Sequence, residues 1–296
     1  ISGERTVKVT VASNLIGTDV AGTAAIPNCL GGVKIVGNSF ANTIGPGNVI
    51  SGNASPVADG VSIGGKVWEP NVVKGNIIGP AKDLSTNLGN WRTAIVVDST
   101  RYDPVYPGQV ATIGPGNTRG FALEDGVSIT GSCEKVQLFG NYIGLAPDPN
   151  NASVFIEMGN GRDGVRIGTS GVSPTDPTTS GHLIGGTTAQ DRNVISSNGT
   201  VLIPGGSGIH LATSSATNIT IQGNVIGRDG VNLADHGNSR DGITITGGGN
   251  NTIGGVSPAA ANVIAGNGNH RHQRQPEADD QDADRERAAA GRPAVA

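Results

Sequence analysis

The residues of this sequence with the most chemical potential occupy equivalent places in a recurring phrase. Arg166 is the third residue of the phrase at 164–167, and His210 is the third residue of the phrase at 208–211. Asp98 directly follows a weaker form of the phrase. A guanidinium can bind a sugar carboxylate through two hydrogen bonds, and an imidazole beside it can add a further contact. We therefore expect Arg166, His210 and Asp98 to contact a ligand.

Catalysis would require more groups than these three. If the apolar residues of each phrase point inward, the residue between them points outward, and the outward residues are Lys34, Ser62, Val96, Ser128, Arg166, His210 and Thr244. The next outward position adds one carboxylate, Asp98. Glycoside hydrolysis by the usual route needs two carboxylates about 5–10 Å apart. A lyase or epimerase needs a base with a cation or metal beside it. The sequence therefore predicts no catalytic residue.

The same column places Arg166 beside His210. Two cationic groups at that separation repel, which favours an uncharged His210. The alternative interpretation is that both are solvated surface residues.

Four aspartates directly precede the glycine that begins a phrase: Asp59, Asp125, Asp163 and Asp241. An aspartate at such a turn can accept a backbone N–H and cap it. Calcium coordination is the alternative, because carboxylates are also calcium ligands. We favour the caps and predict no metal site and no cofactor. His182 and His236 fall in expected loops and are predicted to be solvated.

These phrases belong to an internal repeat of about 70 residues, and each unit divides into two coils of about 35. Coils begin near residues 32, 59, 93, 125, 163, 207 and 241. Within each phrase apolar and polar residues alternate, which indicates short strands. Because such strands cannot bury an apolar face alone, we expect successive coils to stack around a shared interior. Cys29 and Cys133 would then lie three coils apart as free thiols.

Asparagine recurs in register with the apolar residues. Asn14, Asn76, Asn141 and Asn224 each begin an Asn-x-Ile-Gly phrase in alternate coils. Asparagine tolerates tight corners, and asparagines stacked at one corner can hydrogen-bond to each other and to backbone. We predict that these four form a structural ladder.

The Asp-Gly-Ile-x-Ile and Asn-Val-Ile-Ser-Gly-Asn phrases resemble the repeats of the pectate-lyase-like superfamily and, more narrowly, those of bacterial surface and secreted repeat proteins. The resemblance implies an all-β fold: a single-stranded right-handed parallel β-helix of about seven coils plus partial ends. It covers residues 1–269, which we expect to be part of a longer repeat. Residues 270–296 lose the pattern and are predicted to be a disordered, low-complexity tail.

Composition limits the partners. The net charge is −4, and no Lys/Arg run lies in the repeated region, so nucleic acid is not an expected partner. No apolar run is long enough to span a membrane. We expect a monomer that presents loops near residues 80–90, 99–109, 145–160, 171–181 and 228–240.

The superfamily that the repeats resemble includes lyases, hydrolases, epimerases, phage tailspikes and adhesins. The favoured hypothesis is a non-catalytic secreted or cell-surface scaffold that contacts polysaccharide or cell-surface glycan. The alternatives are a polysaccharide lyase, hydrolase or epimerase, and a phage tail-fibre protein. The expected location is extracellular or at the cell surface.

Overall fold

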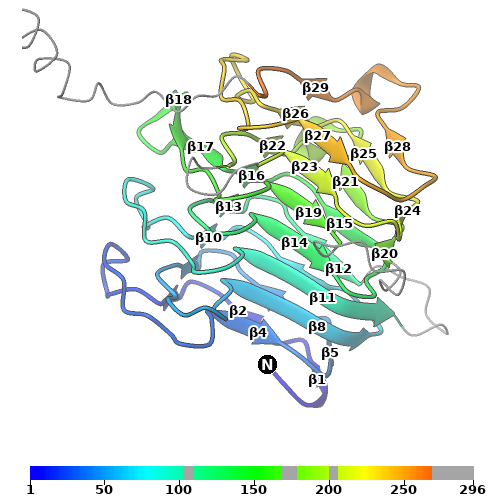
Figure 1. The fold of residues 1–296 in the computed structure, drawn as a ribbon. Coiled ribbons are helices and arrows are strands. Elements are labelled where there is room, and N and C mark those ends of the chain that lie inside the picture. The colour runs from blue at the N-terminus through cyan, green and yellow to red at the C-terminus, as the bar shows by residue number, and fades with distance from the viewer. Residues whose placement is uncertain (103–109, 169–178, 200–205, 269–296) are drawn as a thin grey trace, which may run out of the picture.

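The computed structural model describes residues 1–102, 110–168, 179–199 and 206–268. The chain is all-β and adds one strand to each of three parallel sheets on every circuit, which we call a coil (Figure 1). The first sheet contains β4 (Val33–Ile35), β8 (Val61–Val67), β11 (Ile95–Tyr102), β14 (Val127–Thr130), β19 (Val165–Ile167), β23 (Ile209–Leu211) and β27 (Ile243–Ile245).

The other two sheets have eight strands each. The second sheet contains β2 (Thr10–Val11), β6 (Thr43–Ile44), β9 (Asn71–Val73), β12 (Ala111–Ile113), β15 (Val136–Leu138), β21 (Leu183–Gly185), β25 (Thr220–Gln222) and β28 (Thr252–Ile253). The third contains β3 (Leu15–Ile16), β7 (Val49–Ile50), β10 (Ile77–Ile78), β13 (Thr118–Arg119), β16 (Tyr142–Ile143), β22 (Val194–Ile195), β26 (Val225–Ile226) and β29 (Val263–Ile264).

The coil starts expected from the repeat are confirmed by the first sheet, whose seven strands begin one to two residues after them. Each strand pairs in parallel with its counterpart in the next coil; Val165 is opposite Ile209 and Ile167 is opposite Leu211. The alternating apolar residues point inward and are fully buried, as Ile35 and Ile129 show. Stacked strands therefore enclose one apolar core between the three sheets.

Asparagines line the corner between the second and third sheets in every coil. Their side chains form one chain of amide hydrogen bonds: Nδ2 of Asn76 donates to Oδ1 of Asn117 at 3.0 Å, and Nδ2 of Asn117 donates to Oδ1 of Asn141 at 3.0 Å. The complete ladder is Asn14, Asn48, Asn76, Asn117, Asn141, Asn193, Asn224 and Asn262. The sequence predicted only the asparagines of alternate coils, because the other four are followed by Val-Ile-Ser, Thr-Arg-Gly or Val-Ile-Ala rather than by x-Ile-Gly.

The predicted ladder members also bond to backbone. Asn76 and Asn141 are buried, and each donates to two carbonyls besides its neighbouring asparagine. Asn224 does the same, whereas Asn14, in the first coil, is exposed. A second ladder, which the sequence argument missed, runs along the corner between the third and first sheets: Asn53, Asn90, Asn160, Asn198, Asn238 and Asn267, with Ala122 in one coil.

Two expected loops are more regular than predicted. Residues 145–160 contain an antiparallel hairpin of β17 (Leu145–Asp148) and β18 (Asn151–Glu157). Its turn is fixed by Asp148, whose carboxylate accepts the Asn150 amide at 2.7 Å. The strand β11 continues into the loop expected from residue 99. The predicted tail, 270–296, lies outside the described residues.

Besides this hairpin, four further short strands lie outside the three sheets. They form two parallel pairs, β1 (Glu4–Val7) with β5 (Asn38–Phe40) and β20 (Thr179–Ser180) with β24 (Ala216–Thr217). The only helices among the described residues are two single 3₁₀ turns, Ala189–Asp191 and Pro258–Ala260.

One core position carries a charged residue. Arg119 takes the inward place that Ile78 and Ile143 occupy in the neighbouring coils. Its side chain is fully buried, and none of its three nitrogens has a hydrogen-bond partner among the described residues. Burial lowers the pKa of this guanidinium to about 9. A buried ion without a partner loses its hydration and recovers nothing in exchange.

Replacing Arg119 with isoleucine should therefore stabilise the protein by about 1–4 kcal/mol, since isoleucine matches the core on both sides. Urea unfolding followed by circular dichroism measures the change. The control is Thr118→Val on the same strand, which should shift the stability by less than about 0.5 kcal/mol. A lower unfolding midpoint for Arg119→Ile would show that the guanidinium has a stabilising partner.

Candidate functional site

The outer face of the first sheet carries the polar column expected from the sequence. The register pairs Lys34 with Ser62, Ser62 with Val96, Val96 with Ser128, Ser128 with Arg166, Arg166 with His210, and His210 with Thr244. Not every outward-pointing side chain is exposed to solvent, however: Val96, Ser128 and Arg166 are buried. The accessible part of the column lies toward its ends.

A groove of about 530 Å³ occupies this face over the coils of β4, β8, β11 and β14. Lys34 and Ser62 of the outward column line it, and Asp98, exposed in the adjacent column, lines it with Thr130. The Thr130 hydroxyl donates to the Asp98 carboxylate at 3.2 Å. Arg92 lines the same groove from the turn before β11. The structure thus brings Asp98 into a groove, but with Lys34 and Arg92 rather than with Arg166 and His210.

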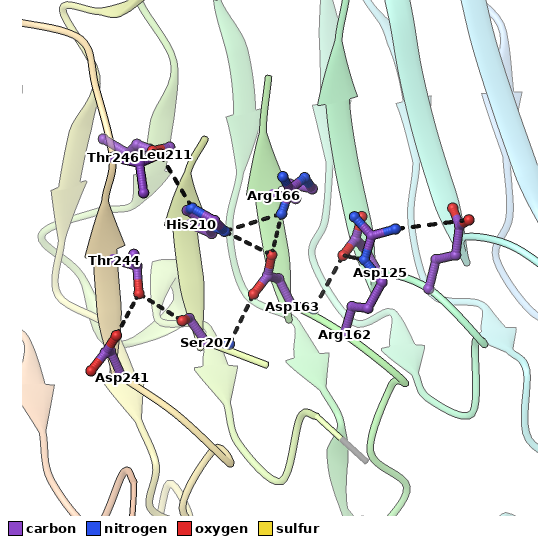
Figure 2. A network of polar contacts seen from close by, with 11 residues as sticks. Asp125, Arg162, Asp163, Arg166, Ser207, His210, Leu211, Asp241, Thr244 and Thr246 are labelled. Carbon is purple, nitrogen blue, oxygen red and sulfur yellow. Dashed lines mark hydrogen bonds and ion pairs between the residues drawn. The ribbon is translucent and has the colours of Figure 1, made fainter. Parts of the chain in front are cut away.

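Arg166 and His210 form a compact cluster farther along the sheet with a third group, Asp163 (Figure 2). Asp163 Oδ2 lies 2.7 Å from Arg166 Nη1 and 3.1 Å from His210 Nδ1. Arg166 Nη1 is itself 3.0 Å from His210 Nδ1. The other oxygen of Asp163 accepts the Ser207 amide at 2.8 Å. The expectation of a repelling cationic pair is wrong, because a carboxylate lies against both groups.

The alternative expectation, two solvated side chains, is also wrong. The side chains of Arg166 and His210 are only 10% and 16% exposed. Burial alone would raise the pKa of Asp163, but the hydrogen bonds from His210 and the Ser207 amide and the charge of Arg166 outweigh it. The pKa of Asp163 therefore lies below its usual value.

His210 has two incompatible partners at Nδ1. A carboxylate only accepts hydrogen bonds and a guanidinium only donates them. Nδ1 therefore donates to Asp163 when it carries a proton and accepts from Arg166 when it does not. Nε2 lies 3.4 Å from the Thr246 hydroxyl, which also donates to the Leu211 carbonyl at 3.1 Å. Asp163 and Nδ1 of His210 are thus occupied within the cluster, and the low exposure of the Arg166 and His210 side chains leaves little of it accessible to a ligand.

Three of the four recurrent aspartates link successive coils rather than closing their own turns. Asp125 Oδ1 accepts the amide of Asp163, and Asp163 Oδ1 accepts the amide of Ser207, each one coil farther along. Asp59 likewise accepts the Thr93 amide at 3.3 Å. Asp241 is exposed and accepts from the Thr244 hydroxyl. The predicted acceptor role is present, but the amide that is accepted belongs to the next coil and not to the aspartate's own turn.

Ion pairs run beside these aspartates along the same edge of the sheet. Arg92 lies 3.8 Å from Glu124, and Arg162 lies 3.8 Å from both Glu124 and Asp125. Burial raises the pKa of Asp125 to about 6 despite the opposing charge of Arg162, and burial likewise raises the pKa of Asp59. Oppositely charged side chains meet along this edge because the turns that carry them are stacked on one another. These turns are separated by unequal numbers of residues, so the pairing could not be predicted from the sequence.

The two histidines that were predicted to be solvated instead make contacts with other side chains or with backbone. His182 is buried; its Nδ1 accepts the Val136 amide at 3.1 Å, so the proton is on Nε2, 2.8 Å from the Thr179 hydroxyl. Burial lowers its pKa to about 3. His236 Nδ1 lies 2.7 Å from Glu157 of the hairpin.

The cysteines and the metal-ligating residue types give no further site. Cys29 and Cys133 are thiols and not joined in a disulfide; Cys29 is exposed, and Cys133 is buried with its Sγ 2.9 Å from the Thr130 carbonyl. In the part of the chain that the structure describes, no group of three or more His, Cys, Asp or Glu residues could hold a metal ion.

Comparison with known proteins identifies no family for this chain. No protein-family model matches the chain, and no curated protein matches it. Among the described residues no helix is long and apolar enough to cross a bilayer.

The cluster geometry predicts unequal roles for two equivalent aspartates. Asp163→Ala should cost about 3 kcal/mol, because it leaves the buried Arg166 without its carboxylate partner. Asp241→Ala, two coils on and exposed, is the matched control and should cost less than about 1 kcal/mol. Chemical unfolding measures both, and equal losses would mean that Asp163 acts only as a turn residue.

Proposed function

We propose that this chain is an extracellular or cell-surface scaffold that binds polysaccharide in the groove on its first sheet. The single observation that carries the proposal is the groove itself. It is about 530 Å³ in volume and is lined by hydrogen-bonding and charged groups that lie on a rigid sheet, with Lys34, Ser62 and Asp98 in successive coils. A row of such groups across parallel strands fits an elongated polar polymer better than a compact small molecule.

The finer fold belongs to the same proposal. We infer a right-handed parallel β-helix, because each circuit adds one strand to each of three parallel sheets, and crossovers between parallel strands are right-handed in almost all proteins. The amide ladders and the scarcity of charge in the core suit a rigid extracellular rod. The repeat phrases are the feature that links this rod to secreted and surface repeat proteins.

The arrangement of carboxylates argues for binding without turnover. Two carboxylates line the groove, Asp59 and Asp98. Asp98 is in register with Gly64, five residues beyond Asp59, which separates the two by about 16 Å along the strand. Glycoside hydrolysis by a carboxylate pair requires about 5–10 Å. Farther along the sheet, Nδ1 of His210 is held by Asp163 and Arg166.

Isothermal titration calorimetry with oligogalacturonate, alginate oligomers and a neutral β-glucan tests the proposal. The wild type should bind at least one of them, and Ser62→Trp, which fills the groove, should weaken that binding at least about tenfold. Lys34→Ala should weaken binding of an acidic oligomer more than binding of the neutral glucan, because it removes an ammonium from the groove.

Val72→Trp is the matched control, since Val72 lies on the outer face of the second sheet between Thr43 and Thr112. It should leave the affinity unchanged. Equal affinity of Ser62→Trp and wild type would remove the groove as the site. Release of shortened or unsaturated products would contradict the non-catalytic proposal.

A further inference from the structure

Four large apolar side chains are exposed along one border of the groove. Leu30 and Val57 line the groove itself and are 80% and 56% exposed. Trp91 and Leu123 are each about half exposed and line an adjoining hollow of about 180 Å³. Trp91 directly precedes Arg92, a groove residue. We call these four residues the apolar strip.

Two members of the strip, Trp91 and Leu123, are one coil apart. Asn90 pairs with Asn53 in the preceding coil and with Ala122 in the following one, so Trp91 and Leu123 occupy equivalent places. The amide of Leu123 donates to the carbonyl of Asn90, which keeps that register. Successive coils are about 4.8 Å apart, so the indole and the leucine form a continuous surface along the stacking direction.

The side chains beside the strip are polar. Asn87 and Asn90 line the same hollow as Trp91, and the side-chain amide of Asn90 belongs to the second ladder. The guanidinium of Arg92 lies within ion-pair distance of Asp59 and Glu124. The border of the groove therefore offers an apolar surface and hydrogen-bonding groups side by side.

We infer that the apolar strip is a stacking platform for pyranose rings, with Trp91 as its anchor, and that the bound polysaccharide lies along the stacking direction of the coils. A pyranose ring has an apolar face of C–H groups and a polar edge of hydroxyls. The C–H face packs on the indole, while the hydroxyl edge turns toward Asn87 on one side and the groove on the other. The inference rests on the proposed glycan-binding function and specifies how the ligand is held.

The width of the strip favours a polysaccharide over a folded protein. The strip presents about one side chain per coil, whereas a stable protein interface buries about 800 Å² on each partner around a broad apolar centre. The charged side chains of Arg92, Glu124 and Arg162 beside the strip are already paired along this edge of the sheet, so they are less available to a protein partner. A narrow amphipathic chain matches both features.

Calorimetric titration with the oligosaccharide that the wild type binds best tests the inference. Trp91→Ala should weaken binding about tenfold, the loss expected for one aromatic stacking contact. Trp91→Phe retains a ring and should lie within about threefold of the wild type. Trp68→Phe, a tryptophan that packs on Phe40 away from the strip, is the control and should not change the affinity.

Tryptophan fluorescence supplies an independent readout. The ligand should shift the emission of Trp68→Phe, in which Trp91 is the remaining indole, but not that of Trp91→Phe. If Ser62→Trp abolishes binding while Trp91→Ala binds as the wild type does, the stacking platform is overturned and the groove proposal stands. If the wild type binds no glycan, both are overturned.

Discussion

The amide hydrogen bonds between asparagines in successive coils are the constraint on which the rest of the structure depends. In the ladder between the second and third sheets, each buried Asn accepts through Oδ1 from the coil before it and donates through Nδ2 to the coil after it, as Asn141 does between Asn117 and Asn193. A shift of one residue in any coil would break this chain and turn the inward isoleucines outward. The ladders therefore fix the register that the apolar core requires, and the core in turn shields the amides from water.

The same register determines how side chains are arranged on the outer face of the first sheet. Because every coil is held to its neighbours at two corners, side chains at equivalent places are aligned in columns about 4.8 Å apart. The same alignment produces two different results along one sheet. Toward the first coils it leaves an open groove with Lys34, Ser62 and Asp98, whereas at Asp163, Arg166 and His210 it brings opposite charges together and closes them on each other.

The sequence predicted the parts of this structure that depend on the repeat. The strand starts of the first sheet and the order of the outward column from Lys34 to Thr244 followed from the phrases alone. The contacts of Asp163 could not be predicted from the phrases, because they join a turn residue to one side chain in the strand that follows it and to another in the next coil. The spacing of Asp163 and Arg166, three residues apart, was a usable sign of their contact.

Other features departed from the repeat and were missed for that reason. The hairpin at residues 145–157 is an insertion, although its Val-Phe-Ile run after a Pro-Asn-Asn turn is typical of a strand. Arg119 replaces an isoleucine within an intact phrase, and periodicity gives no account of a buried charge. The groove could not be predicted because it depends on which turns protrude beside the sheet.

Native-state hydrogen exchange at the ladder amides tests the central claim most directly. The backbone N–H of Asn141 donates to Oδ1 of Asn193, and that of Asn76 donates to Oδ1 of Asn117. If the ladder fixes the register of the coils, these amides should exchange only through global unfolding, with the denaturant dependence of the whole protein. Exchange on the timescale of an exposed turn, at low denaturant and with no such dependence, would show that the corners open independently and would contradict the account.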